Sequence, residues 1–203
     1  LSKAGQWKDF GRIHEERTLA RGVYSQLATN TKFYVYNVGV GRYLTKGEAY
    51  GTQAIVDDTA SPMRFELRRT TGMADNTYYL YSDDTGNSNH ILFRTNTDTK
   101  VGTGVYACFV DGTTTDEAKG YWKVALVGGT DNVYTLQTPS NQTGYAATKY
   151  LGVVTSHKSN AATPTYGIYS DIVYTDYPLN CQWMFVPYDE ARTENYQTSL
   201  DLK

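Results

Sequence analysis

Phe33-Tyr34-Val35-Tyr36-Asn37 is the first of three similar stretches that decide the fold class of this chain. The other two are Tyr78-Tyr79-Leu80-Tyr81-Ser82 and Tyr134-Thr135-Leu136-Gln137-Thr138. Each stretch alternates in the manner of a β-strand, whose successive side chains point to opposite faces. The first and third residues of each stretch are therefore predicted to face one core.

Three further stretches, each beginning with an aromatic residue, end the same units. They are Phe65-Glu66-Leu67, Trp122-Lys123-Val124-Ala125-Leu126 and Trp183-Met184-Phe185. The segments between opening and closing differ in length, as expected where insertions fall in surface loops. About four strands per unit, none able to bury its own face alone, predict an all-β domain of three unequal four-strand repeats. A β-sandwich with chance alternation is the alternative.

The two ends of the chain differ from this pattern. The segment 7–17 is dense in charge and carries Trp7, Phe10 and Ile13, a spacing that suits a short helix or an extended arm lying on the domain. The tail after residue 190 is polar again. The predicted organisation is an N-terminal arm at 1–30, a domain at 31–190 with repeats at about 31–72, 76–129 and 131–188, and a C-terminal extension at 191–203.

Composition narrows the function classes. Among 203 residues the net charge is −2, so there is no basic field for nucleic acid or anionic lipid, and no apolar run is long enough to span a membrane. The chain has 19 Tyr against 6 Phe and 3 Trp. Tyr favours strands. Its flat ring and solvent-exposed hydroxyl are suited to binding sugars, although the alternative is that Tyr only covers the faces of strands. Because Leu1 opens the chain without a visible signal peptide, we expect a mature secreted or cell-surface form, or a fragment.

The first repeat resembles a known family. Residues 33–44 resemble the opening of a ricin B-like β-trefoil repeat, and Gly51-Thr52-Gln53-Ala54 resembles the Gly-Thr-x-Val hairpin that follows in that family. The closing aromatics stand where the family has the Trp of its Gln-x-Trp motif. The resemblance implies a β-trefoil, with a six-stranded barrel capped by three hairpins. It also implies a sugar-binding lectin role, often as an accessory module of secreted bacterial proteins.

The expected sugar-pocket residues of that family are missing. Where the family has an Asp after the second strand, this chain has Thr45 and Gly152. Where it has the Gln of Gln-x-Trp, this chain has Met63, Gly120 and Cys181. The resemblance therefore carries over no known sugar specificity.

Candidate binding residues come instead from the chemistry of sugar recognition, which needs an aromatic face and planar polar groups. Asp and Asn also favour ordinary turns, so turn chemistry is the alternative for each position. The candidates are Tyr50, Asp57 and Asp58 in the first repeat, and Tyr166, Tyr169, Asp171 and Asn180 in the third.

The sequence contains no recognisable catalytic motif. His14, His90 and His157 have no neighbouring nucleophile or base, and no catalytic residue, metal site or cofactor is predicted. Cys108 and Cys181 lack metal-ligand spacing, and the sequence leaves open whether they form a disulfide. We therefore expect a non-catalytic module that binds a polysaccharide or glycan. A protein-interaction or inhibitor domain with an extracellular protein partner is the alternative.

Overall fold

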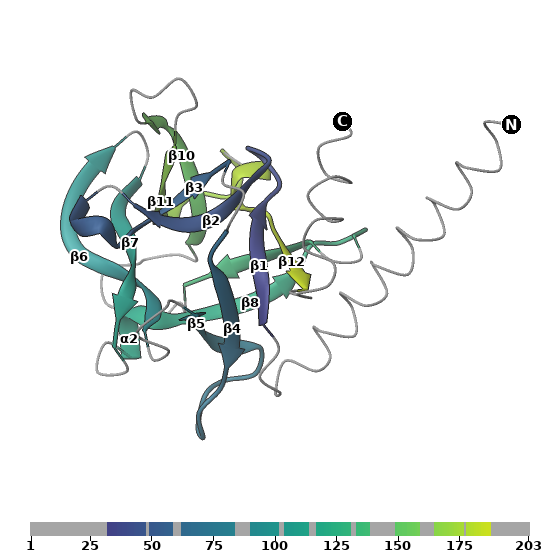
Figure 1. Ribbon diagram of the computed structural model, residues 1–203. Helices are drawn as coiled ribbons and strands as arrows, with labels where there is room; N and C mark the ends of the chain where they lie inside the picture. Colours follow the sequence, from purple (N-terminus) through teal and green to yellow (C-terminus); the bar gives the residue numbers. More distant parts are fainter. Residues whose placement is uncertain are drawn as a thin grey trace, which may run out of the picture.

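The chain folds into an all-β structure, described here from a computed structural model. The twelve strands, one four-residue helix and two 3-10 turns are the elements of the described residues (Figure 1). The predicted N-terminal arm and C-terminal extension lie outside these residues. The structure describes residues 32–47, 49–58, 62–83, 90–101, 104–113, 117–130, 133–138, 149–158, 165–176 and 178–187.

The twelve strands differ in length. Most are five to seven residues long, and β6, β7 and β10 are longer. The elements are β1 (Lys32–Asn37), β2 (Arg42–Gly47), η1 (Ala49–Gly51), β3 (Gln53–Asp57), β4 (Arg64–Arg68), β5 (Thr77–Asp83), β6 (Ile91–Val101), β7 (Gly104–Gly112), α2 (Glu117–Gly120), β8 (Tyr121–Leu126), β9 (Val133–Gln137), β10 (Tyr150–Lys158), β11 (Tyr166–Ile172), η3 (Leu179–Cys181) and β12 (Trp183–Pro187).

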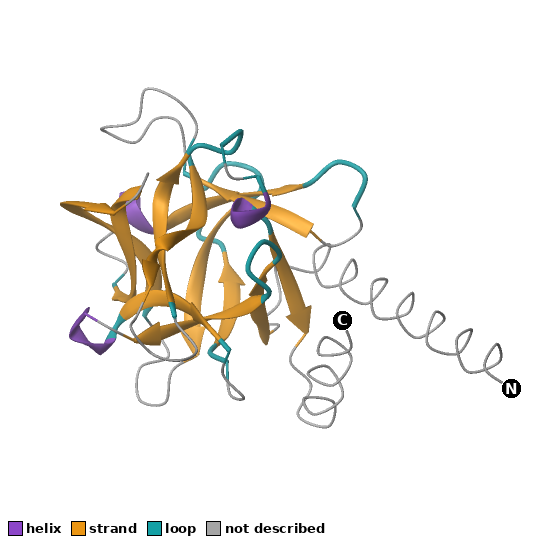
Figure 2. Cartoon of the chain, turned by 90° about the horizontal axis from the view of Figure 1, so that it is seen from above, coloured by secondary structure: helices purple, strands orange, loops and turns teal. Residues whose placement is uncertain are grey.

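Six of the described strands pair into a closed ring. β1 pairs β4, β4 pairs β5, β5 pairs β8, β8 pairs β9, β9 pairs β12, and β12 returns to β1, all antiparallel. Closing the ring removes exposed edges from these strands. Figure 2 shows the resulting barrel-like arrangement of the strands.

The other six strands form three hairpins, β2–β3, β6–β7 and β10–β11. Their second strands contact one another, with Gln53 opposite Phe109 and Ala107 opposite Tyr169. β11 also pairs β3, where Gly167 lies opposite Ile55. Ring and hairpins together make a trefoil-like arrangement in which the second strands of the hairpins lie side by side.

The core contains the residues that alternation predicts. The first and third residues of the opening stretches are buried, and the three closing aromatics have no exposed surface, which confirms this part of the prediction. These residues are Phe33, Val35, Tyr78, Leu80, Tyr134 and Leu136 from the opening strands, and Phe65, Trp122 and Trp183 from the closing strands.

Two indoles tie closing strands to hairpins. Trp122 Nε1 donates to the Leu92 carbonyl at 3.0 Å, and Trp183 Nε1 donates to the Leu151 carbonyl at 2.9 Å. Both bonds are buried, so the polar end of each indole is satisfied inside the core.

Small polar residues lie buried at or next to the ends of the three opening strands. Asn37, Ser82 and Thr138 are 0%, 1% and 3% exposed. The Thr138 hydroxyl lies 3.2 Å from the Lys149 carbonyl, and the Ser82 hydroxyl lies 3.2 Å from the Val110 carbonyl. Each side chain thus bonds backbone of a later segment where the chain leaves the barrel.

Both cysteines are free and buried, so the disulfide that the sequence left open is not formed in this structure. Burial raises the pKa of the Cys181 thiol to about 12. Burial, and then the negative charge of Asp171, raise the pKa of the Cys108 thiol. Both thiols are therefore protonated at neutral pH.

Candidate ligand-binding surface

Tyr50 is the most exposed large side chain of the described hydrophobic residues. It is 93% exposed, and its backbone has φ 58° and ψ 8°, in the left-handed region. Gly51 follows with φ 70°. Turns of this kind favour Asn or Gly, and a bulky residue there costs about 1–3 kcal/mol. An aromatic ring that buries almost nothing does not repay that cost through folding.

Two phenylalanines extend the ring of Tyr50 into a row. The Tyr50 and Phe109 ring centroids are 6.4 Å apart, and those of Phe109 and Phe93 are 6.3 Å apart; both pairs are tilted by 44°. Both phenylalanines are half-buried. We call Tyr50, Phe109 and Phe93 the aromatic row. In Figure 1 the η1 turn that carries Tyr50 lies beside β6 and β7, away from β1 and β12.

Strand register explains why the rings of Phe109 and Phe93 meet. Phe109 of β7 lies directly opposite Gln53 of β3 on one side and opposite Phe93 of β6 on the other. Directly opposed residues point to the same face of a sheet. The side chains of Gln53, Phe109 and Phe93 therefore line up across β3, β7 and β6. Phe109 also packs against a second buried cluster that includes Tyr169 and Cys181, which fixes its position.

Polar groups lie close to the row. The amide side chain of Gln53, opposite Phe109, is only 5% exposed. The carboxylate of Asp111 is half-buried and belongs to the residue two positions after Phe109 in the same strand. Aromatic faces with a few planar polar groups are what a sugar requires.

The structure separates the three candidates of the first repeat. Tyr50 precedes β3, whereas Asp57 ends it, and the strand between Gln53 and Asp57 is about 13 Å long. Asp57 lies opposite Tyr43, and its Oδ1 accepts a hydrogen bond from the Asp58 amide at 2.7 Å. Asp58 is exposed. Both aspartates therefore lie at the other end of β3 from Tyr50, with a whole strand between them.

The tyrosine candidates of the third repeat are engaged by other residues. The Arg42 guanidinium carbon lies 5.0 Å from the centroid of the Tyr166 ring, over its face. Tyr169 is 0% exposed and belongs to the second buried cluster. A ring with no exposed surface offers none to a ligand, so Tyr169 is left out of the binding surface.

The polar candidates of the third repeat hold backbone. Asp171 is 8% exposed, and its Oδ1 accepts a hydrogen bond from the Tyr106 amide at 3.0 Å. Asn180 Nδ2 donates to the Val153 carbonyl at 3.1 Å, and the Asn180 carbonyl accepts from the Asn37 side chain. The structure therefore does not bring the four candidates of the third repeat into one exposed site.

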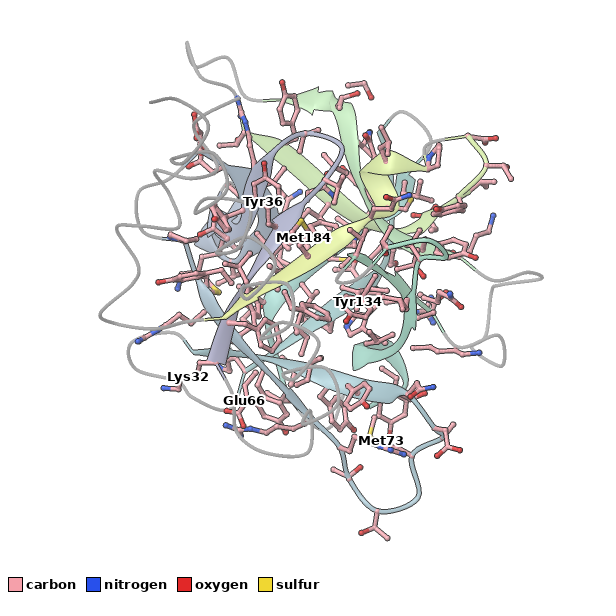
Figure 3. All side chains as sticks on the ribbon, turned by 90° about the vertical axis from the view of Figure 1, so that its right-hand side faces the viewer. Lys32, Tyr36, Glu66, Met73, Tyr134 and Met184 are labelled. Carbon is pink, nitrogen blue, oxygen red and sulfur yellow. The ribbon has the colours of Figure 1, made fainter. Side chains whose placement is uncertain are left out.

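A second group of tyrosines lies on the outer face of β1 and β2. The Tyr36 and Tyr43 ring centroids are 5.1 Å apart, and those of Tyr34 and Tyr43 are 5.9 Å apart, both edge to face. Tyr36 also lies opposite Met184 of β12, and Figure 3 shows both side chains on this face. These rings pack on one another and are at most half-exposed. They present less free ring surface than Tyr50 does.

Sequence reasoning missed Phe93 and Phe109. Both follow a core residue directly, Leu92 and Cys108, so each reads as part of a short apolar run. Only the pairing of β6 with β7 shows that the two rings share a face. Register between hairpins is set by long-range packing, which local alternation does not reveal.

Within the described ranges, no group of three or more His, Cys, Asp or Glu side chains is arranged to hold a metal ion. A helix long and apolar enough to cross a membrane is likewise absent from that part of the chain.

The comparisons with known proteins bear on the fold. No protein-family profile and no curated protein matches the sequence. The botulinum neurotoxin serotype D binding domain matches the structure with a TM-score of 0.57 at 11% identity, over 78% of this chain and 42% of that chain. A lysenin pore structure matches with a TM-score of 0.51 at 14% identity, over 80% and 47%. A Caenorhabditis elegans protein of unknown function matches with a TM-score of 0.53 at 11% identity, over 76% and 92%.

This chain spans less than half the length of the neurotoxin domain and of lysenin. At such low identities the likeness shows the fold alone. That fold is all-β and trefoil-like, and its solved neighbours include binding domains of botulinum neurotoxins.

Proposed function

We propose that this chain is a non-catalytic carbohydrate-binding module that holds its glycan on the aromatic row. Tyr50 carries the proposal, because it combines 93% exposure with a left-handed backbone. Strained residues persist where the surrounding structure holds them, and they cluster at ligand sites. A free tyrosine face stacks on the C–H surface of a sugar, while the nearby half-buried carboxylate of Asp111 bonds its hydroxyls.

The proposal extends to the architecture and the setting. We infer that the twelve strands are three unequal copies of one four-strand unit, as in ricin B-like β-trefoils. The threefold recurrence of the pairings supports this inference. We further propose that the module is secreted or at the cell surface of a bacterium, as an accessory to a larger protein. Two solved neighbours support a binding role: lysenin in complex with phosphocholine and the receptor-binding domain of botulinum neurotoxin type G.

A glycan array with four proteins tests the function. The wild type is expected to bind, and Tyr50→Ala is expected to lose at least tenfold in affinity because the stacking face is gone. Tyr50→Phe keeps the face and is expected to keep most of the binding. Leu126→Ala removes another exposed apolar side chain, 46% exposed on β8, and serves as the matched control.

The same observation favours one other function. Exposed tyrosines are frequent hot spots of protein interfaces, so Tyr50 also suits a protein-interaction or inhibitor domain. A pull-down from extracellular proteins, run beside the array, separates the two. A saturable protein partner that Tyr50→Ala abolishes, with no glycan bound, would replace the carbohydrate proposal with this alternative.

A further inference from the structure

We propose that the aromatic row binds consecutive units of a linear, equatorially linked glycan chain, and that this site crosses from the first repeat into the second. The inference rests on the proposed function and adds the class of glycan to it. A chain of this class is extended and flat, and its sugar units expose C–H faces to aromatic rings.

The spacing of the rings carries the inference. The centroid distances along the row are nearly equal, 6.4 and 6.3 Å, and both tilts are 44°. A pyranose ring is close in width to a phenyl ring, so each ring supports one sugar unit. A nearly constant step between the rings fits a polymer of repeating units better than it fits a single compact ligand.

The row is held rigidly by paired strands at Phe109 and Phe93, and it is exposed to solvent at Tyr50. Phe109 and Phe93 stand opposite each other on β7 and β6, so their separation is fixed before binding. Tyr50, on the η1 turn, lies at the end of the row and is nearly fully exposed. A terminal sugar is usually held by a pocket that encloses it, whereas an open platform accepts the middle of a chain.

The row also draws its residues from two copies of the unit. Tyr50 lies between β2 and β3, whereas Phe93 and Phe109 lie on the next hairpin along the chain. The pairing of β3 with β7, through Gln53 and Phe109, brings these hairpins together. Loss of the pocket residues that the family has within each repeat does not affect a site built in this way.

Chain-length dependence tests the inference. Calorimetry is run with two linear series of one to five sugar units, β-1,4-linked glucose and β-1,4-linked N-acetylglucosamine. For the series that binds, affinity is expected to rise about two- to tenfold with each unit up to three and then level off. Phe109→Leu keeps an apolar side chain but removes the ring. It is expected to lower the affinity for the three-unit chain toward that for one unit. Circular dichroism melting checks that this variant is folded.

The outcomes separate the two proposals. Equal affinity for one unit and three units, abolished by Tyr50→Ala, would overturn the extended site and keep the glycan-binding function. Unchanged three-unit binding by folded Phe109→Leu would overturn it in the same way. Absence of binding to both series and to every glycan on the array would remove the function, and the extended site with it.

Discussion

Asn37 offers the sharpest test of how the fold is held together. Its side chain is fully buried, and its amide nitrogen and amide oxygen form hydrogen bonds to different segments. Nδ2 donates to the Asn180 carbonyl at 2.9 Å and to the Gln182 carbonyl at 3.4 Å. Oδ1 accepts from the Gly39 amide at 3.1 Å and the Val40 amide at 3.2 Å. One amide thus joins the turn after β1 to the segment that leads into β12.

Asn37→Asp keeps the shape but replaces the donor by a second carboxylate oxygen. That oxygen faces two carbonyls inside the core, so the variant loses two hydrogen bonds and buries an uncompensated charge. Each bond is worth about 1 kcal/mol net, and an unpaired buried charge costs about 3–5 kcal/mol. Together these costs predict that the free energy of unfolding at about pH 7 falls by about 5–7 kcal/mol.

The loss of unfolding free energy in Asn37→Asp is expected to become smaller as the pH falls. Burial and the two carbonyls raise the pKa of the new carboxyl in the folded state above its unfolded value of about 3.9. The folded state therefore binds the proton more tightly, and the deficit shrinks as the pH falls through the folded pKa. A protonated carboxyl also donates again, to the Asn180 carbonyl.

Urea unfolding followed by circular dichroism at about pH 7 and about pH 4 measures both effects. Asn37→Leu, which loses all four hydrogen bonds without adding a charge, is the matched control, and its deficit should be the same at both pH values. An equal deficit for Asn37→Asp at the two pH values would refute the proposed contacts of Nδ2. So would a deficit below about 1 kcal/mol at neutral pH.

Two further outcomes follow from buried groups. Trp183→Phe removes the donor to the Leu151 carbonyl and leaves that carbonyl buried, so urea unfolding should show a loss of about 2–4 kcal/mol; a loss below about 1 kcal/mol would contradict the bond. Because the thiols of Cys108 and Cys181 are buried and their pKa values are raised, a maleimide should label neither in the native protein and both in guanidinium chloride without reductant. Labelling that needs reductant would show a disulfide instead.

The core was predictable because alternation is a local signal. Phe33 and Val35 face inward for the same reason that Tyr78 and Leu80 do, since side chains two apart on a strand share a face. The fifth residue of each opening stretch follows the same rule. Asn37 is buried for that reason. Its burial was not predicted from the sequence, because polar residues are ordinarily exposed.

The site was less predictable because it depends on which strands become neighbours. Tyr50 was identified from the sequence as a flat ring in a hairpin, and the structure places it at an exposed tip. Asp57 and Asp58 were grouped with it because they are near in sequence, although a strand separates them. Phe109 joins Tyr50 from another hairpin, at a separation in sequence that no local pattern covers.

The same contrast explains how a chain of this fold can lack the sugar-pocket residues that the resemblance implied and still carry the proposed binding surface. Residues that hold backbone, such as Asp171 and Asn180, are fixed by the geometry of the trefoil-like fold and cannot change freely. Tyr50 makes little contact with the core. A substitution there is therefore expected to lower the stability of the fold little but to weaken the proposed ligand binding strongly. A surface built from such a residue and from the edges of two hairpins can change without altering the barrel. Substitutions at Tyr50 should therefore alter ligand preference far more than stability, whereas those at Asn37 or Trp183 should do the reverse.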